Sequence, residues 1–508
     1  MRGTLTELMS SLDGAQLTGD AVFDGVSTDS RSAQAGSLFV ALRGESFDAH
    51  DFLDQVAARG VAAVVVERLP AGWDSGKVPA IIVSDTLVAL GRIANHWRGR
   101  FNLPVIGVTG SNGKTTVKEM IASILAAAFG EEGRLATRGN LNNEIGVPLT
   151  LFRLSEQHKA AVIEMGMNHP GEIARLAAIA APTLAMVNNA QREHQEFMHT
   201  VEAVARENGA ALAALADDGV AVFPHGDEFT PLWRELAGAR AVITFGLSTE
   251  ADVSCSHRAA EDFGSDLFVS VRAPDGSLRQ FYVGLQAAGE HNVRNALAAV
   301  ACAIGAGIAI DHIKQGLEAF SPVNGRLQKK RAANGATIID DSYNANPDSV
   351  KAAIDVLAQA AKPRILVLGE MAEVGTQGQQ FHEEIGAYAA AKGIEHVLAT
   401  GGLARHLVNA AQAAASQESG TVVEYFEQFD GLLAALDAHL SGRSDATVLI
   451  KGSRFMKMER AVQHLIGSNN KNKEAHESCC SGSLIISRTT LAHCGSLTSS
   501  HSAPSSPP

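Results

Sequence analysis

Short apolar runs alternate with segments of helical periodicity along most of the chain. In the first hundred residues, runs such as Ser37–Leu42 and Val61–Val66 are separated by turn-rich polar stretches, which predicts a small α/β domain. From residue 103 the order changes: Pro104–Thr109 is β-rich, Gly110–Gly113 forms a turn, and Val117–Phe129 carries apolar residues at helical spacing. The pattern therefore predicts a strand that runs through a glycine turn into a helix.

The alternation of strands and helices continues beyond this unit. Ala160–Glu164 and Leu184–Asn188 are further candidate strands, and Thr200–Ala216 has the pattern of a helix. Strands that alternate with helices form a mostly parallel sheet covered by helices. We expect this central domain to end near Pro322, where a Phe-Ser-Pro sequence separates it from a second pattern of the same kind.

The second pattern predicts another α/β domain, closed by a helix over Lys457–Ile466. Its candidate strands are Thr337–Asp340, Arg364–Leu368, His396–Ala399 and Thr447–Ile450. The predicted domains are therefore residues 1–100, 101–322 and 323–467. The remaining residues, 468–508, contain 11 serines in 41 positions and end in Ser-Ser-Pro-Pro, which predicts a tail without fixed structure.

Composition excludes several classes of protein. The 508 residues are 46% hydrophobic and carry a formal net charge of −13, which argues against a broad nucleic-acid-binding surface. The longest near-apolar run, Leu297–Ile310, is too short to span a bilayer, and Met1–Ser10 lacks the pattern of a signal peptide. The five cysteines show neither disulfide nor zinc spacing. We expect a cytoplasmic monomer that binds no nucleic acid and does not insert into membranes.

The turn after the first central strand has the residues of a phosphate-binding loop. Gly110 and Gly113 let backbone N–H groups approach phosphate oxygens, Lys114 adds a positive charge, and the Thr115 hydroxyl can bind Mg²⁺. A plain strand-to-helix turn is the alternative, but the adjacent Gly-Lys-Thr-Thr favours nucleotide binding. The loop as a whole comprises Thr109, Gly110, Ser111, Asn112, Gly113, Lys114, Thr115 and Thr116.

Two polar residues after neighbouring strands are candidate metal ligands. Glu164 ends an apolar strand, so its carboxylate is expected at the same sheet edge as the loop. His194 follows the next strand and could supply a further ligand. A solvated strand end and a surface histidine are the alternatives.

Two further clusters are unusual for loops. Asn292 and Asn295 lie about one helical turn apart at the start of an Ala-rich segment, so both carboxamides can face one ligand. Asp341 follows a strand in Asp340–Pro347, where a carboxylate suits ribose hydroxyls. Helix capping by Asn292 and Asp341 is the alternative explanation.

Taken together, these motifs resemble the Mur ligases, ATP-dependent enzymes that form amide bonds in peptidoglycan precursors. The resemblance covers about residues 20–460. The motifs that carry it are Ser27–Arg31, Gly36–Leu42, Thr109–Thr116, Gly139–Pro148, Glu164–Gly166, Glu290–Ala298, Asp340–Pro347, Leu368–Met371 and Lys451–Arg454.

The resemblance implies an α/β protein of three domains and a specific reaction. A small N-terminal α/β domain would hold a UDP substrate, a central P-loop domain with a parallel sheet would bind ATP, and a C-terminal Rossmann-like domain would close over the site. The motifs resemble most the type that joins D-alanyl-D-alanine to UDP-N-acetylmuramoyl-tripeptide through an acyl phosphate, so the implied cofactors are ATP and Mg²⁺.

The resemblance also implies roles for individual residues. The implied catalytic residues are Lys114, Glu164, His194, Arg326 and Lys451, and the implied metal ligands are Thr115, Glu164 and His194. The ATP site would comprise Thr109–Thr116, Asn292, Asn295, Arg326 and Asp341. The other substrates would contact Ser27, Thr28, Asp29, Ser30, Arg31, Asn143, Tyr343, Asn346 and Arg454.

One departure from the family pattern concerns the second metal ion. Mur ligases commonly carry a carbamylated lysine about fourteen residues after the metal histidine, and this count arrives at Asn208. Because an amide cannot take a carbamate, we expect Glu207 or Glu196 to supply the missing negative charge.

Three other functions remain as alternatives. The sister ligase that adds the third amino acid would carry a His-Thr-Pro version of the Asp340 region, which is absent. A nucleotide switch or kinase would not need the clusters around Asn292 and Lys451. A catalytically inactive scaffold is disfavoured because the candidate catalytic residues are intact.

Overall fold

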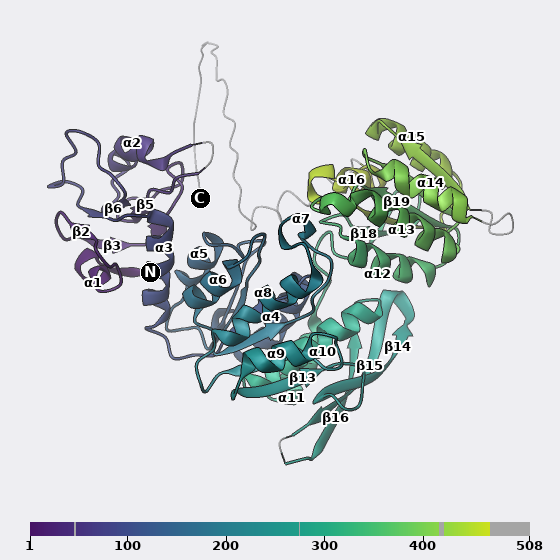
Figure 1. The fold of residues 1–508 in the computed structure, drawn as a ribbon, viewed down its shortest axis with the longest axis horizontal. Helices are drawn as coiled ribbons and strands as arrows, with labels where there is room; N and C mark the ends of the chain where they lie inside the picture. Colours follow the sequence, from purple (N-terminus) through teal and green to yellow (C-terminus); the bar gives the residue numbers. More distant parts are fainter. Residues whose placement is uncertain (45–46, 274, 416–420, 468–508) are drawn as a thin grey trace, which may run out of the picture. The chain divides into compact units, whose positions relative to one another are not determined.

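The computed structural model describes residues 1–44, 47–273, 275–415 and 421–467, and Figure 1 traces the chain through them. Within this part of the chain the strands form four hydrogen-bonded sheets. None of the helices in the described ranges is long and apolar enough to cross a membrane. The tail predicted from residue 468 onward lies outside the described residues.

The first hundred residues form two of these sheets. Strands β1 (Arg2–Thr4) and β3 (Val22–Asp24) pair antiparallel, and a five-stranded sheet has the order β2-β7-β6-β5-β4. The predicted apolar runs are confirmed as β5 (Leu38–Val40) and β6 (Ala63–Val66), which are fully buried. The other elements are α1 (Leu5–Met9), β2 (Gln16–Leu17), β4 (Val26–Ser27), η1 (Ala49–Phe52), α2 (Leu53–Ala58), β7 (Ala80–Ile82) and α3 (Thr86–Arg98).

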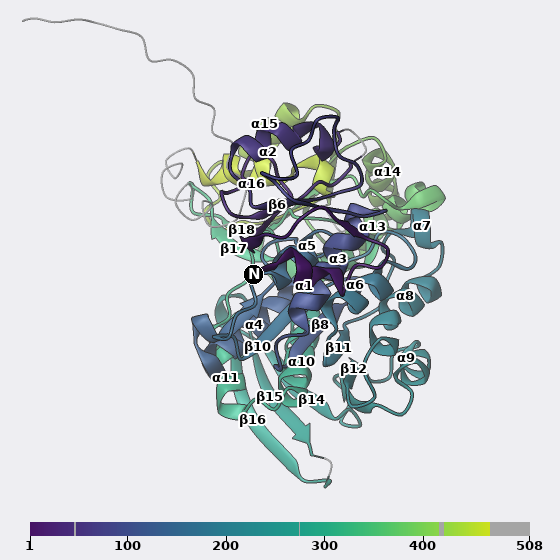
Figure 2. The same cartoon turned by 90° about the vertical axis from the view of Figure 1, so that its left-hand side faces the viewer.

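The central region is built on a sheet of nine described strands in the order β16-β15-β14-β13-β12-β11-β8-β10-β9. Figure 2 shows β8, β11 and β12 as neighbours in this sheet. Its strands are β8 (Val105–Thr109), β9 (Arg134–Ala136), β10 (Ala160–Glu164), β11 (Leu184–Val187), β12 (Val220–Pro224), β13 (Ala241–Phe245), β14 (Val253–Ala260), β15 (Gly264–Arg272) and β16 (Leu278–Leu285).

Helices cover both faces of this sheet because its central strands are apolar on both sides. On β8, Ile106 and Val108 pack into the core that contains α4 (Lys114–Phe129), α10 (Glu290–Gly305) and α11 (Ile310–Ala319). The opposite face contributes to a second core with these helices: α3, α5 (Gly146–Leu151), α6 (Glu172–Ala180), α8 (Val201–Ala213) and α9 (Thr230–Ala237). Since α3 belongs to the first hundred residues, this second core is continuous with theirs.

The expectation of a mostly parallel sheet is confirmed for β8 to β14, whereas β15 and β16 form an antiparallel extension. Along β15, more buried and more exposed residues alternate, because one face packs on the core and the other meets solvent. Sequence analysis did not identify these strands.

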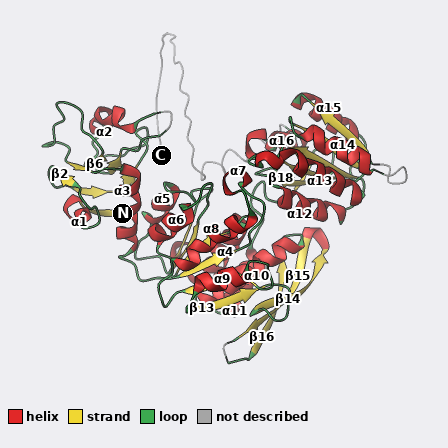
Figure 3. Cartoon of the chain, in the orientation of Figure 1, coloured by secondary structure: helices red, strands yellow, loops and turns green. Residues whose placement is uncertain are grey.

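The last described region forms a six-stranded sheet in the order β17-β18-β22-β19-β20-β21, parallel except for β17 (Gln328–Arg331). Figure 3 shows its helices and strands by colour. All four predicted strands are confirmed, as β18 (Thr337–Asp341), β19 (Arg364–Gly369), β20 (His396–Thr400) and β22 (Thr447–Lys451). The other elements are α12 (Pro347–Ala358), η4 (Gly375–Gln377), α13 (Gly378–Ala391), α14 (Ala404–Ala414), β21 (Val422–Phe426), α15 (Phe429–Leu440), η5 (Arg454–Met456) and α16 (Glu459–Ile466).

Candidate functional site

The loop between β8 and α4 has the geometry of an anion-binding loop. α4 begins at Lys114, and its N-cap residue Gly113 has a φ of +81°. A Cβ atom on Gly113 would lie 2.4 Å from the Asn295 side-chain oxygen, so only glycine fits there. The first N–H groups of a helix have no partner within the helix and carry partial positive charge. This end of α4 is therefore suited to a phosphate group.

Carboxamide side chains support the loop from the neighbouring strand. Asn188, which follows β11, donates hydrogen bonds to the Asn112 carbonyl oxygen at 2.7 Å and to the Asn295 side chain at 2.8 Å. The side-chain oxygen of Asn189 accepts from the Asn112 backbone N–H at 2.9 Å. Asn295 in turn donates to Asn292 at 3.1 Å. These bonds fix the loop without using the N–H groups at the start of α4.

The two asparagines predicted to face one ligand do lie together. Both are in the first turns of α10 and both line the cavity described below. The capping alternative is wrong for both Asn292 and Asp341, because Gly289 is the N-cap residue of α10 and Asp341 ends β18. The capping residue in the second cluster is Asn346, whose side chain accepts from Ser349 at the start of α12.

Glu164 is a buried carboxylate with one free oxygen. Its Oε1 accepts hydrogen bonds from the Thr115 hydroxyl at 3.2 Å and from Asn142 Nδ2 at 2.9 Å. Its Oε2 is buried and has no hydrogen-bond partner among the described residues. Buried carboxylate oxygens are rarely left unpaired unless a ligand or ion completes the site. Thr115 and Glu164 are therefore chemically suited to share a divalent cation.

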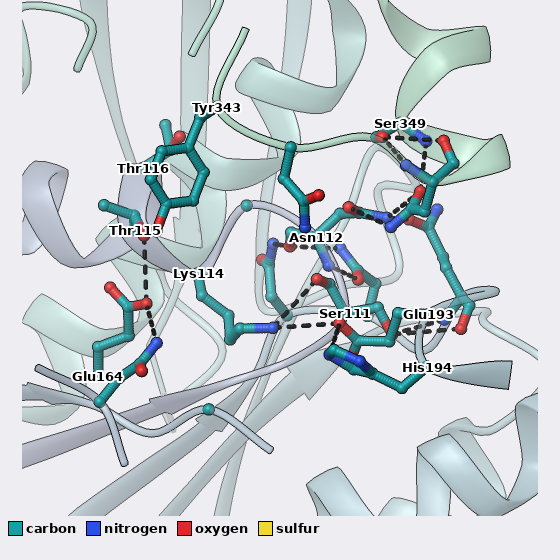
Figure 4. Close-up of a pocket in the computed structure, with 18 of the residues that line it drawn as sticks. Ser111, Asn112, Lys114, Thr115, Thr116, Glu164, Glu193, His194, Tyr343 and Ser349 are labelled. Atoms are coloured by element: carbon teal, nitrogen blue, oxygen red, sulfur yellow. Dashed lines mark hydrogen bonds and ion pairs between the residues drawn. The ribbon is translucent and has the colours of Figure 1, made fainter. Parts of the chain in front are cut away.

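Lys114 lies close to the carboxylate of Glu193, as Figure 4 shows. The distance between Lys114 Nζ and Glu193 Oε2 is 3.3 Å, and Nζ also donates to the carbonyl oxygens of Gly110 and Ser111. His194 has a left-handed backbone with a φ of +47°. Its Nδ1 lies 2.7 Å from Glu373 Oε2, and this contact lowers the pKa of Glu373.

The last domain contributes a second group of charges. β18 and β22 pair in parallel with Asp341 opposite Lys451, and the two side chains form an ion pair of 2.7 Å. Burial raises the pKa of Asp341, and Lys451 opposes this effect. The Arg326 guanidinium lies 4.3 Å from the centre of the Tyr343 ring, and that of Arg454 lies 5.6 Å from it.

The central and last domains border one cavity of about 1010 Å³. The predicted residues that line it are Ser111, Asn112, Gly113, Lys114, Thr115, Thr116, Asn143, Glu164, His194, Asn292, Asn295, Arg326, Asp341, Tyr343, Asn346, Lys451 and Arg454. Thr109 and Gly110, the first two residues of the loop, do not line the cavity. Ser27–Arg31 also lie outside it, with the Arg31 side chain bonded to Asp29. The structure thus brings together residues from six separate motifs.

The cavity also contains groups that sequence analysis missed. His291 lines it, and burial, helped by Lys451, lowers the pKa of His291 to about 4, so its imidazole is neutral at neutral pH. Glu193 and Glu373 line it as well. Glu193 is adjacent to His194 in the sequence, and this adjacency was the available signal for it. Glu373 carries no comparable signal.

The structure corrects the expectation about Glu207. Its two carboxylate oxygens accept hydrogen bonds from the backbone N–H groups of Gly171 and Ile173, at 2.8 and 2.9 Å, at the start of α6. Glu207 therefore stabilises a helix terminus and does not line the cavity. Glu196 is exposed and does not line the cavity either.

Family models of known proteins match most of the chain. Residues 22–98 match the Mur ligase family catalytic domain, residues 108–303 the Mur ligase middle domain, and residues 325–454 the glutamate ligase domain of Mur ligases. The chain belongs to the Mur ligase family.

Particular relatives are similar over nearly their whole length. The chain is 38% identical to the UDP-N-acetylmuramoyl-tripeptide--D-alanyl-D-alanine ligase of Escherichia coli over 91% of this chain and 98% of that protein. The protein of the same name from Bacillus subtilis is 36% identical, covering 88% and 94%.

Solved structures of MurF ligases are also similar to this chain over most of its length. A crystal structure of MurF from Acinetobacter baumannii superimposes with a TM-score of 0.82 at 33% identity, covering 92% of this chain and 99% of that one. MurF ligase from Thermotoga maritima in complex with ADP superimposes with a TM-score of 0.76 at 26% identity, covering 87% and 97%.

Proposed function

We propose that the protein is an ATP-dependent ligase that joins D-alanyl-D-alanine to UDP-N-acetylmuramoyl-tripeptide, giving the pentapeptide precursor of peptidoglycan, ADP and phosphate. The observation that carries this proposal is the single cavity bordered by the phosphate loop around Lys114 and by the Asp341–Lys451 ion pair. Family membership and the near-complete coverage of the Escherichia coli relative support it.

The chemistry requires positive charge around the γ-phosphate. The tripeptide carboxylate attacks this phosphorus atom, so two anions approach each other while ADP leaves. Lys114 and Arg326 are the cations that we assign to the phosphate oxygens, and both line the cavity. In the same scheme Asn292 and Asn295 contact the adenine and Asp341 contacts the ribose. The backbone of Ser111–Thr116 surrounds the phosphates.

The residues present fit the Mg²⁺ that the family implies. We assign Thr115, Glu164 and His194 to it, because Glu164 keeps a buried oxygen without a partner beside the Thr115 hydroxyl. Bound there with ATP, the ion would neutralise phosphate oxygens. No group of three or more His, Cys, Asp or Glu side chains within the described ranges could hold a metal ion. Magnesium sites that are completed by substrate phosphates commonly have only one or two carboxylate ligands from the protein.

The second half of the reaction takes place on the acyl phosphate. The amine of D-alanyl-D-alanine attacks the acyl carbon, and phosphate leaves as the amide forms. Lys451 and Arg454, with Tyr343, Asn346 and Asn143, are the residues we assign to the incoming dipeptide and the transferring phosphate. Because an acyl phosphate hydrolyses in water, we expect the domains to close before chemistry, with a hinge near Pro322.

The remaining assignments concern the other end of the substrate and the setting of the enzyme. We assign the UDP group to residues 1–100 through Ser27–Arg31, ATP to residues 101–322, and closure over the site to residues 323–467. In this proposal the enzyme works as a monomer in the cytoplasm.

Phosphate release from ATP tests the function. Purified protein is incubated with UDP-N-acetylmuramoyl-tripeptide and Mg²⁺, with and without D-alanyl-D-alanine, beside a Lys114→Ala variant. We expect release that requires the dipeptide and that falls by a factor of about 10² or more in the variant. Release with UDP-N-acetylmuramoyl-dipeptide and a diamino acid instead would identify the sister activity. No release from folded protein in any mixture would favour an inactive scaffold.

A further inference from the structure

Glu193 is a buried carboxylate whose charge is only partly compensated. It lies between β11 and α7 (Gln195–Met198) and is 7% exposed. Its Oε2 contacts Lys114 Nζ at 3.3 Å, whereas its Oε1 is buried without a hydrogen-bond partner in the described part of the chain. The residue lines the cavity beside the phosphate loop, where Figure 4 shows it next to His194. An oxygen in this position is available to a ligand or an ion.

The partner of Glu193 is the lysine that the proposed reaction needs elsewhere. In this structure Lys114 Nζ points back to its own loop and donates to the carbonyl oxygens of Gly110 and Ser111 as well as to Glu193. An ammonium group has three donors, so these contacts use all of them. To reach a phosphate oxygen, Lys114 must give up at least one of these contacts, and the contact with Glu193, at 3.3 Å, is the longest of the three.

Separating the pair would leave Glu193 buried without a cation. A buried charge that loses its partner is strongly unfavourable, so another cation has to replace the ammonium group. His194 does not suffice, because its Nε2 lies 3.9 Å from Glu193 Oε2 and its Nδ1 is directed to Glu373. The cation that arrives together with ATP is Mg²⁺.

We propose that Glu193 exchanges Lys114 for a Mg²⁺ ion when ATP binds, and that it serves as a ligand of this ion next to His194. The inference rests on the proposed function only in so far as the cavity binds ATP with Mg²⁺. Glu207 and Glu196 do not serve as this ligand, because Glu207 accepts hydrogen bonds from the start of α6 and Glu196 is exposed. In this exchange, Lys114 leaves Glu193 and moves to the phosphates, while Glu193 binds the metal ion.

The inference predicts metal binding that depends on nucleotide and on Glu193. Mn²⁺ replaces Mg²⁺ as the probe, and free Mn²⁺ is followed by electron paramagnetic resonance during titration of the full chain. A non-hydrolysable ATP analogue is present or absent, and no tripeptide or dipeptide is added. With the analogue we expect Glu193→Gln to weaken the binding of one Mn²⁺ by at least about tenfold, which corresponds to about 1.4 kcal/mol. Glu196→Gln, the control three residues further on, should bind as the unmodified protein does.

A second variant tests the exchange from the side of the lysine. Lys114→Met leaves Glu193 without its cation even in the empty site. The exchange predicts that this variant binds Mn²⁺ more tightly than the unmodified protein when no nucleotide is present. If Glu193→Gln fails to fold, as judged by thermal unfolding, the lysine variant and Glu193→Asp carry the test. Glu193→Asp keeps the charge but withdraws the oxygens by one carbon–carbon bond, and it should bind Mn²⁺ more weakly.

The outcomes separate this inference from the proposed function. Unchanged Mn²⁺ binding in Glu193→Gln, or no increase in Lys114→Met, would overturn the exchange even if the protein ligates D-alanyl-D-alanine. Conversely, a Glu193-dependent metal site in a protein that ligates nothing would support the exchange and reject the proposed reaction.

Discussion

The side chain of Asn208 holds the phosphate loop in place. Its Oδ1 accepts a hydrogen bond from the Gly110 backbone N–H at 2.9 Å, and its Nδ2 donates to the Val204 carbonyl oxygen at 3.1 Å. The Thr109 hydroxyl also donates to the Asn208 carbonyl oxygen, at 3.3 Å. The residue at the position expected for a carbamylated lysine is thus 1% exposed, and both polar atoms of its side chain make hydrogen bonds.

Replacement of Asn208 should therefore damage stability and nucleotide binding together. Asn208→Ala leaves the buried Gly110 N–H without a partner, which costs about 1–3 kcal/mol in the free energy of unfolding. We also expect weaker binding of ATP, because the loop loses its support. Urea denaturation and nucleotide titration measure the two effects. Arg206→Ala, an exposed change in the same helix, is the control, and equal behaviour of the two variants would contradict the role given to Asn208.

A charge cluster joins the central domain to the last domain. Arg192 donates to both carboxylate oxygens of Asp348 and contacts Glu384, which also accepts from Lys351. Burial opposes both shifts, yet these contacts raise the pKa of Arg192 and lower the pKa of Glu384. The cluster lies at the rim of the cavity, since Arg192 and Asp348 both line it.

We expect the side chains of Arg192 and Asp348 to be energetically coupled. In a double-mutant cycle with Arg192→Ala and Asp348→Ala, the coupling energy should be about 1 kcal/mol or more, because the contact is bidentate and partly buried. The ligation rate should fall in both single variants, as domain closure loses a contact. Additive effects on unfolding would show that the pair does not act as a unit.

The close approach of α13 and α14 depends on Gly386. A Cβ atom on Gly386 would lie 2.0 Å from the Leu407 carbonyl oxygen, which is backbone and cannot move aside. Gly386→Ala should therefore lower the free energy of unfolding by about 1–3 kcal/mol or more. Gly431→Ala, in α15, meets only the Phe426 ring at 3.6 Å and should be neutral or stabilising by about 0.5–1 kcal/mol. The opposite ranking in thermal unfolding would contradict the packing described here.

Glu395 makes the stability of the last domain sensitive to acid. Burial alone would raise its pKa, but bonds from Arg364 and Lys362 lower the pKa of Glu395 from 4.5 to about 2. A carboxylate whose pKa is lowered by folding stabilises the folded state at pH values above its pKa in the unfolded chain. For Glu395 this stabilisation is lost as the pH falls from about 4.5 to about 2.

The corresponding variant is Glu395→Gln. At pH 7 it should be less stable by about 1 kcal/mol, a figure reduced for solvent screening. The difference in the free energy of unfolding between the variant and the unmodified protein should become smaller below pH 4.5 and approach zero near pH 2. Urea denaturation at pH 7, 4 and 3 measures it, and a difference independent of pH would show that the carboxylate charge is not involved.

The sequence determined much of this protein by itself. The strand before the phosphate loop, the helix after it, Glu164 at the end of β10 and the strand that leads into Asp341 were all predicted, because apolar periodicity and glycine spacing are local properties. The motifs around Lys114, Asn292 and Asp340 also indicated the family.

Other features depended on contacts between distant residues. The Lys114–Glu193 pair, the link from Asn208 to Gly110 and the bond between Asn112 and Asn346 join positions 79, 98 and 234 residues apart. No local pattern specifies which of several carboxylates or amides meets the loop. Glu207 and Glu196 were the carboxylates expected to supply the missing negative charge, yet the carboxylate that contacts Lys114 is that of Glu193. Only the tertiary structure decides this, because burial and the direction of a side chain follow from how the elements pack.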